Sequence, residues 1–482
     1  MSIQLVIIIL YVCILFGISI YVKRRTENSS GFLFAGRKLT TTLVAANIAG
    51  TAIGAASTIG VAENAFQFGI AAGWYNAAWA AGAVTMAMVA AGKYRELHCT
   101  TIPELFERYY DKKGRAIAVL GMITIQLVIT SLQYIAGGAI LSALLPDIFS
   151  LKGGMITSAI VFIGTTILGG LWSSGLSNIL STILIYVGVL TSTIVIVSRQ
   201  GGIGAIATAL PPGIDWFGPV GGFGLATIVG WFVVMMTQTV SAQGPVQIAC
   251  AAVDKKAAKH GFMWGALLMF PIGFACAVMG IAAKAAYPAM NATMALPQMI
   301  MSLDPVVAGL TLAALWAADV ATACHILLAA GTLFSQDIYK RFYKPDIDDK
   351  HYTLVNRYAI LILGAVTLWF AFNAVGIVKT MLIGLSLTTA FTLVFLFTMF
   401  MPSLCRRNSA FYTTLAGIVT LVAWQTLPEV RVFAHPIYLE WVVCFAAFFI
   451  VALVDKNKIS TAEANGYTVN GAAKLAGMAG RN

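Results

Sequence analysis

One carboxylate, Asp319, lies deep within an apolar segment of the chain, LAALWAADVATACHILLAAGTLF. Thr322 follows three residues later and His325 six residues later in the same segment. Residues three apart share a side of a helix, so Asp319 and Thr322 can address the same volume. A carboxylate at membrane depth costs about 2.5 to 3.5 kcal/mol and by default marks an ion or proton site. The alternative is an acid that faces a water-filled crevice or hydrogen-bonds to a neighbouring helix.

Two further titratable residues each allow two interpretations. His325 is either a histidine hydrogen-bonded to a backbone carbonyl or water, or a proton relay partner of Asp319. Glu63 falls at the expected external end of another apolar segment. A solvated loop position is the plainer interpretation for Glu63, and a vestibule that attracts cations is the alternative.

The composition is that of a polytopic membrane protein. The chain has 482 residues, of which 59% are hydrophobic and 10% are charged, and its mean hydropathy is +0.86. The apolar runs of this chain are long enough to span a bilayer repeatedly. The first segment has no basic region before it and no cleavage site after it, so we expect a retained helix rather than a signal peptide. About thirteen transmembrane helices are predicted, at residues 3–22, 42–62, 70–92, 116–144, 155–171, 177–198, 221–250, 261–283, 305–337, 355–374, 378–400, 409–427 and 434–454.

The distribution of basic residues predicts the orientation in the membrane. With the N-terminus outside, 25 of the 30 lysine and arginine residues fall on the cytoplasmic side. We therefore expect a multi-pass protein of the cell membrane with its C-terminus in the cytoplasm. The same asymmetry explains the net charge of +11, so no nucleic-acid partner is expected. The seven cysteines are scattered and form no CxxC pattern, which predicts neither a disulfide framework nor a metal site.

Two of the predicted spans contain residues that interrupt helices. The second span carries Gly50, Gly54 and Gly60, and the seventh carries Gly244 followed by Pro245. Such breaks free backbone groups, which is tolerated only where they line a cavity or are buried in protein. The two spans are five apart, so each would open a five-span unit, and the second unit would have inverted topology. The predicted fold is all-α, with a five-plus-five inverted repeat and a broken first helix in each repeat.

This organisation divides the chain into five parts. No part resembles a soluble domain, because the polar stretches are too short to form a core. The segment CTTIPELFERYYDKKGR is predicted to form an interfacial helix that begins near Pro103 and packs under the bundle. The parts are residues 1–41 (an extra span and a cytoplasmic loop), 42–200 (the first repeat), 201–402 (the second repeat), 403–454 (two C-terminal spans) and 455–482 (a cytoplasmic tail of disordered composition).

Several strings along the chain resemble the sodium/solute symporter family. They are FLFAGRKL before the second span, AANIAG within it, TTIPELFERYY, GGLWSSGLSNILS and PVQIACAAVDKKAAKHG. The most specific string is PVVAGLTLAALWAADVATACHILLAAGTLFSQDIYKRF, whose DIYK at residues 337–340 matches the usual ending of this family segment. The resemblance covers nearly the whole chain. It implies a LeuT-like fold of ten core helices, alternating access, and uptake of a small solute driven by a sodium gradient.

The resemblance also implies a sodium site between the broken second span and the ninth span. Carried over by position, the ligands would be the carbonyls of Ala45, Ile48 and Ala318 and the hydroxyl of Thr322. Oxygen ligands with little net charge suit a hard ion that must bind and leave in every cycle. For the alanines and the isoleucine, the residue types alone would indicate only apolar packing.

Two positions depart from the family pattern. Ala321 stands where a serine is usual, and Asn178 stands where many members carry an aspartate. We hypothesise that Asp319 supplies the charge that Asn178 lacks. It would do so as a sodium ligand, directly or through another group, or as the protonatable group of a proton-coupled variant.

The solute is expected beside the two breaks, where half-helix ends and polar side chains converge. Each candidate could equally bond neighbouring helices together, because amides and hydroxyls commonly pair across membrane helices. No lysine or arginine lies deep in the core, so an anionic solute would rely on helix N-termini, whereas Asp319 would allow a cationic one. The candidates are Asn47, Thr51, Trp74, Asn76, Gln133, Gln238, Ser241 and Gln243.

The predicted function is sodium-coupled transport of a small organic solute, such as a carboxylate, amino acid, sugar or osmolyte. The alternatives are a proton-coupled or uncoupled transporter of the same fold that uses Asp319, and a transport-like sensor. Only about 28 residues follow the last span, which disfavours the sensor. No catalytic constellation indicates an enzyme, and no repeated filter motif indicates a channel. We expect sodium as the coupling ion, no other cofactor, and the solute and the lipid bilayer as partners, without an obligate protein partner.

Overall fold

The computed structural model describes residues 3–97, 99–373 and 377–459. Over these residues the secondary structure is helical, apart from two isolated bridges between Leu39 and Ala252 and between Arg406 and Lys458. This confirms the all-α prediction. The predicted tail, residues 455–482, lies outside the described residues from residue 460 onward.

The helices of the first half run from α1 to α10. They are α1 (Ile3–Val22), α2 (Ser29–Phe34), α3 (Thr41–Ala52), α4 (Ile59–Phe68), α5 (Trp74–Thr85), α6 (Ala91–Leu97), α7 (Ile102–Tyr109), α8 (Lys112–Leu144), α9 (Leu151–Arg199) and α10 (Ile203–Ala209). A short turn, η3 (Ala55–Ser57), separates α3 from α4.

The helices of the second half run from α11 to α20. They are α11 (Leu225–Ser241), α12 (Gln243–Ala251), α13 (Lys255–Ala286), α14 (Ala295–Met301), α15 (Pro305–Thr332), α16 (Asp349–Ala371), α17 (Ile377–Ser386), α18 (Thr388–Phe400), α19 (Ser409–Thr426) and α20 (Pro436–Val454). The segment η7 (Leu333–Tyr343) continues α15 as a π-helix.

The number of membrane spans stays a prediction. By length and composition, seven of the described helices could cross a membrane, or up to nine if each bent pair counts as one span. The two spans predicted at 155–171 and 177–198 are the two helical parts of α9, which meet at a kink at the non-helical residue Gly170. Gly170 has φ +51°, and a Cβ atom there would lie 2.4 Å from the carbonyl oxygen of Phe32. Only glycine allows this backbone to approach so closely.

Both predicted breaks are present. The helices α3 and α4 meet at a bend of 70°, and α11 and α12 meet at a bend of 49°. The exact positions differ slightly from the glycines that predicted them, because Gly50 lies inside α3 and the second break falls at Ala242. Pro245 lies in the first turn of α12, where a missing backbone N–H breaks no helical hydrogen bond.

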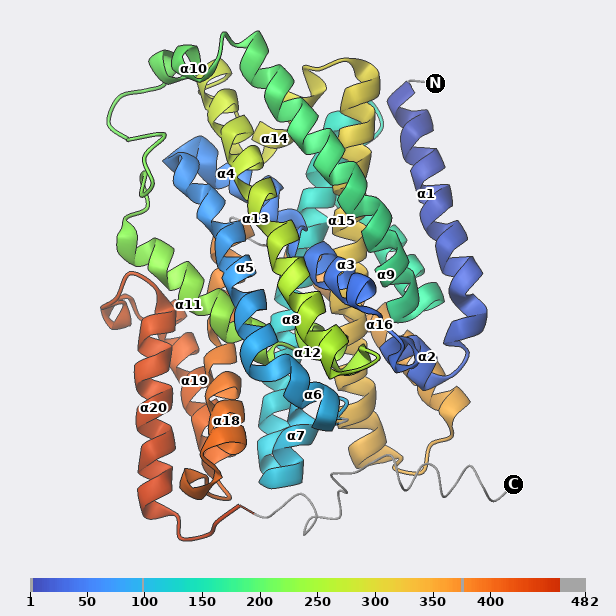
Figure 1. The fold of residues 1–482 in the computed structure, drawn as a ribbon, viewed down its shortest axis with the longest axis vertical. Coiled ribbons are helices and arrows are strands. Elements are labelled where there is room, and N and C mark those ends of the chain that lie inside the picture. The colour runs from blue at the N-terminus through green and yellow to red at the C-terminus, as the bar shows by residue number, and fades with distance from the viewer. Residues whose placement is uncertain (1–2, 98, 374–376, 460–482) are drawn as a thin grey trace.

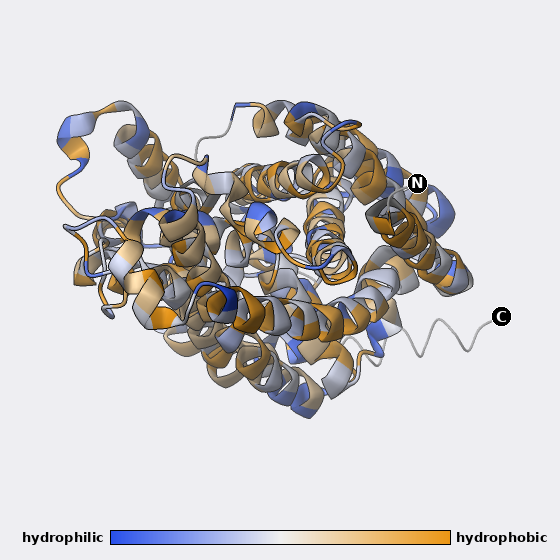
Figure 2. Cartoon of the chain, turned by 90° about the horizontal axis from the view of Figure 1, so that it is seen from above, coloured by the Kyte–Doolittle hydropathy of each residue, from blue (hydrophilic) through white to orange (hydrophobic). Residues whose placement is uncertain are grey.

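The helix α15 forms the centre of the molecule. Its apolar stretch is wholly buried, and it packs against α9, α8, α1 and α3. In Figure 1, α1 lies at one edge of the bundle and α19 and α20 lie at the other. Large apolar side chains such as Leu10, Ile160 and Leu453 are exposed on the surface, and apolar residues occur along most helices seen from above (Figure 2). Lipid would cover such an exposed apolar surface.

The helix predicted to begin near Pro103 is present as α7. The hydroxyl of Thr101 accepts a hydrogen bond from the backbone N–H of Glu104 at 3.2 Å, and Pro103 occupies the first turn. Phe106 and Tyr110 are buried under the bundle. These are the usual signals of a helix start, which explains why the sequence located this helix.

Buried ion pairs tie α7 to α8 and η7. A guanidinium nitrogen of Arg115 lies 2.7 Å from a carboxylate oxygen of Glu107, and another lies 2.6 Å from Asp337 of the DIYK string. Arg341 also pairs with Glu107. Burial raises the pKa of Glu107, but its hydrogen bonds with Arg341 and Arg115 outweigh this and hold the pKa below its ordinary value. Glu107 is therefore ionised at neutral pH.

Candidate functional site

The helix α15 contacts both broken spans through side chains three residues apart. The Thr322 hydroxyl donates a hydrogen bond to the carbonyl oxygen of Gly50 at 2.7 Å. Nε2 of His325 lies 3.1 Å from the carbonyl oxygen of Gly244. Both carbonyls lie beside a break, one in the last turn of α3 and the other in the first turn of α12. A movement of α15 must therefore affect both broken spans.

The predicted sodium ligands do not all converge on Thr322. A Cβ atom on Gly265 of α13 would lie 2.3 Å from the Ile48 side chain and 3.3 Å from the Ala45 carbonyl oxygen. The carbonyl in contact with Thr322 is instead that of Gly50. The physical reason is that α3 stays helical as far as Ala52, one turn beyond Ile48. Ala318 is buried on α15.

Asp319 is fully buried, and neither of its carboxylate oxygens has a hydrogen-bond partner among the described residues. An ionised carboxylate in such surroundings is strongly unfavourable unless it is paired with a cation, and otherwise it takes up a proton. The side chain therefore has the properties required of a cation or proton site. Thr322 lies one turn further along the same helix.

His325 fits its plainer interpretation, a histidine bonded to a backbone carbonyl. Its Nδ1 atom has no partner among the residues that the structure describes, and neither does the Asp319 carboxylate. A direct hydrogen bond between Asp319 and His325 is thus absent from the described part of the chain. Glu63 lies on α4 and is partly buried.

Asn178 packs directly on the same break. A Cβ atom on Gly50 would lie 2.0 Å from Oδ1 of Asn178, so this contact requires glycine. The amide nitrogen of Asn178 lies 3.4 Å from the Ser174 hydroxyl, whereas Oδ1 has no partner within the described ranges. Gly50 thus meets Thr322 on one side and Asn178 on another. Ala321 lines a small separate cavity together with serines of α9.

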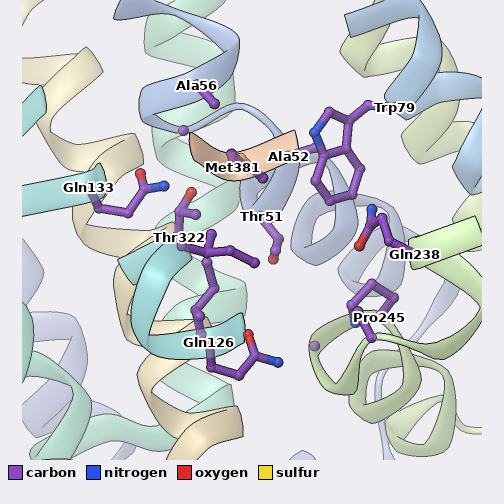
Figure 3. Close-up of a pocket in the computed structure, with 15 residues that line it drawn as sticks. Thr51, Ala52, Ala56, Trp79, Gln126, Gln133, Gln238, Pro245, Thr322 and Met381 are labelled. Atoms are coloured by element: carbon purple, nitrogen blue, oxygen red, sulfur yellow. The ribbon is translucent and has the colours of Figure 1, made fainter. Parts of the chain in front are cut away.

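A narrow central cavity of about 30 Å³ lies between the two breaks. Figure 3 shows its lining side chains converging from several helices. Among the described residues, no charged side chain lines it. The labelled residues are Thr51 and Ala52 of α3, Ala56 of η3, Trp79 of α5, Gln126 and Gln133 of α8, Gln238 of α11, Pro245 of α12, Thr322 of α15 and Met381 of α17.

Three glutamines give this cavity its polar character. Oε1 of Gln133 accepts a hydrogen bond from the backbone N–H of Ala55 at 2.9 Å, which satisfies an amide freed by the first break. The amide nitrogen of Gln238 donates to the Thr239 hydroxyl at 3.0 Å. The side chain of Gln126 makes no hydrogen bond to any described residue. The amides of Gln126 and Gln133 therefore retain donors for a ligand.

The structure brings Thr51, Gln133 and Gln238 of the predicted solute residues into this cavity. The side chains of the other five predicted residues donate hydrogen bonds to backbone carbonyls elsewhere. Amide, indole and hydroxyl groups commonly form such structural hydrogen bonds. Asn47 bonds Leu43 at 2.8 Å, Trp74 bonds Pro219 at 2.7 Å, Asn76 bonds Met269 at 3.3 Å, Ser241 bonds Thr388 at 3.2 Å and Gln243 bonds Thr100 at 3.0 Å.

Sequence reasoning did not propose most of the lining residues as part of a site, among them Gln126, Trp79 and Met381. Gln126 lies seven residues before Gln133, so the two share one face of α8, and this spacing could have identified it. Trp79 and Met381 carry no comparable signal, because an apolar side chain in a membrane span usually packs in the core.

An aromatic layer closes the cavity on one side. The Tyr75 hydroxyl donates to the sulfur of Met381 at 3.0 Å and accepts from the Trp79 indole at 3.1 Å. The Tyr75 ring also meets Trp231 edge-on at 6.4 Å. Because Tyr75 is fully buried, this layer separates the cavity from the space beyond Trp231.

A family description of sodium:solute symporters matches residues 32–417. The chain belongs to the sodium:solute symporter family. The symporter is 26% identical over 414 residues to the sodium/glucose cotransporter of Vibrio parahaemolyticus. This alignment covers 75% of the symporter and 73% of the relative. It is also 24% identical over 431 residues to the sodium/proline symporter of Escherichia coli. That alignment covers 83% of this chain and 84% of the relative.

Solved structures show the same fold. A Na+-coupled sialic acid symporter in a substrate-bound outward-open state matches 95% of the symporter with a TM-score of 0.79, at 18% identity and 99% coverage of that chain. Mhp1, a nucleobase-cation-symport-1 family transporter in a closed conformation, matches 91% with a TM-score of 0.63, at 15% identity and 98% coverage. These matches confirm the predicted LeuT-like fold class. They also confirm, at the level of the family, the predicted function of sodium-coupled solute symport.

Proposed function

We propose that this symporter couples sodium entry to the uptake of a small uncharged polar solute, such as a sugar, polyol or amide. The observation that carries the proposal is the central cavity between the two breaks, where glutamine amides converge without a charged side chain among the described residues. Amides would hydrogen-bond hydroxyl or amide groups, and the Trp79 ring would pack against an apolar face of the solute.

Sodium would bind between α3 and α15, next to this cavity. Its proposed ligands are the Gly50 carbonyl, the Thr322 hydroxyl and the Asp319 carboxylate. Two neutral oxygen ligands and one negative charge suit a monovalent cation. Ala45, Ile48 and Ala318 remain predicted ligands that would need α3 to unwind further. Thr51, which lines the solute cavity, directly follows Gly50, so sodium and solute would bias the same break and thereby couple.

A proton-coupled variant is the second candidate, and the missing partners of the Asp319 carboxylate favour it. In that case Asp319 would take up a proton on the external side and release it on the other. Replacing Asp319 by asparagine would then abolish the pH dependence of uptake, whereas a sodium ligand role predicts a change in sodium dependence.

The proposed location is the cell membrane, with the N-terminus outside. Figure 1 supports this orientation. The first residues of α1 lie at the same end of the bundle as α10, and the last residues of α20 lie at the opposite end. The proposed moving units are the repeats at residues 42–200 and 201–402, flanked by residues 1–41 and 403–454.

Ligand-induced thermal stabilisation tests the solute class. The purified symporter would be heated with sugars, polyols, amides, amino acids and carboxylates, each in sodium and in choline chloride. A ligand at 100 times its Kd stabilises by about 2.7 kcal/mol. We expect stabilisation by an uncharged solute that is larger in sodium. Stabilisation by anions alone, or with no effect of sodium, would contradict the proposal.

A further inference from the structure

A second and larger cavity lies on the other side of the aromatic layer. It has a volume of about 470 Å³ and shares no lining residue with the central cavity. Its walls come from the end of α4, the start of α11, α17, and the connection between α19 and α20. In the proposed orientation this side is external, so solutes outside the cell would reach this cavity first.

One wall of this external cavity is aromatic. The Phe68 and Phe223 rings lie 4.8 Å apart, and the Phe223 and Trp231 rings lie 4.7 Å apart. Trp424 contributes a further ring. Stacked rings of this kind suit a flat, apolar ligand surface.

The same lining also carries hydrogen-bond donors. Arg431 uses Nε and Nη2 to donate to the carbonyls of Trp424 at 2.9 Å and Gln425 at 3.0 Å, which leaves Nη1 for a ligand. Nδ1 of the buried His435 accepts from the backbone N–H of Ile437 at 3.2 Å. The ring proton then resides on Nε2, which has no partner among the described residues.

Part of this lining lies beyond the family match. The family match ends at residue 417, whereas Trp424, Arg431 and His435 follow it. No acidic residue occurs among the described residues that line the cavity. A positive guanidinium and a buried N–H donor in one cavity with aromatic rings favour an anion with a flat apolar body.

We propose that this external cavity is a second binding site that takes an aromatic carboxylate. The rings of Phe223 and Trp231 would hold the aromatic body, and Arg431 and His435 would bind the carboxylate. Trp231 also contacts Tyr75 of the closing layer, and Leu382, next to Met381, lines the site. Occupation would therefore hold the layer closed and slow transport without competing for the central cavity.

Indole-3-acetate is a suitable probe, with indole-3-acetamide as its uncharged match. Binding to the purified full-length symporter would be measured by isothermal titration calorimetry. We expect indole-3-acetate to bind at least tenfold more tightly than the amide, and Arg431→Gln to remove this preference. His435→Asn retains a side-chain acceptor for the α20 N-terminus but loses the distant N–H, so it should weaken binding of the acid several-fold.

Gln126→Ala provides the control, because it alters the central cavity alone. The acid should bind this variant as it binds the wild type. Equal binding of acid and amide, no binding of either, or loss of binding in Gln126→Ala but not in Arg431→Gln would each overturn the proposal. A thermal unfolding curve like that of the wild type would show that each variant is folded.

Discussion

Thr322 and Thr332 are both buried threonines of α15, but their hydroxyls have different partners. Thr322 bonds the Gly50 carbonyl of α3, whereas Thr332 bonds Leu328 within its own helix at 2.7 Å. Thr322→Val should raise the sodium concentration for half-maximal uptake about tenfold, because it removes a ligand and an interhelical bond. Thr332→Val is the matched control and should leave this concentration unchanged. Equal effects of the two substitutions would exclude a sodium role for Thr322.

Gly54 lies where the first break, the solute cavity and Thr322 meet. A Cβ atom there would lie 2.7 Å from both Oε1 of Gln133 and the hydroxyl of Thr322. Gly54→Ala should therefore displace both side chains and weaken sodium and solute affinity together, by about 1 to 3 kcal/mol in total. Gly17→Ala on α1 meets nothing within 4 Å and should have no effect on uptake. Normal affinities in Gly54→Ala would contradict this arrangement.

The residues that sequence could identify are those whose type conflicts with their surroundings. Asp319 is such a residue, because a carboxylate in an apolar run has no ordinary packing role, and its burial without partners confirms the conflict. Gly50 as the partner of Thr322 could not be predicted. Its role depends on how far α3 remains helical, and that depends on tertiary packing.

At the scale of elements, the charge cluster beneath the bundle joins α7, α8 and η7. Arg115→Met would leave the buried Asp337 carboxylate without its ion-pair partner and would leave Glu107 paired with Arg341 alone. We expect destabilisation by about 3 kcal/mol, measured by thermal or denaturant unfolding in detergent. Lys113→Met, on the exposed first turn of the same helix, should be nearly neutral. If both variants were equally stable, the cluster would not hold these elements together.

Helix starts and breaks were the elements best predicted from sequence. Pro103 marked the start of α7, and the glycines of the second and seventh spans marked both bends. The exact site of the second bend was missed by two residues, because Pro245 fits the first turn of α12 as well as it fits a break. The sequence also predicted two spans within residues 151–199, and they meet at the non-helical Gly170 of α9.

At the scale of the whole molecule, the basic residues predict which ends of the helices face the cytoplasm. Glu429 and Asp346 are both exposed and should lie on opposite sides of the membrane. A cysteine introduced at Glu429 should react with a membrane-impermeant maleimide in intact cells, and one at Asp346 should react only after permeabilisation. The wild-type chain, whose cysteines are buried except for Cys13 of α1, gives the background. The reverse labelling pattern would invert the topology.

The coupling of sodium to solute movement is the central claim. It is tested most directly by solute counterflow and uptake in proteoliposomes, driven separately by a sodium gradient and a proton gradient, for the wild type and Asp319→Asn. We predict that the sodium gradient alone drives accumulation by the wild type, and that Asp319→Asn loses this response while it still exchanges solute. Accumulation driven by neither ion, or an unchanged sodium response in Asp319→Asn, would contradict the account.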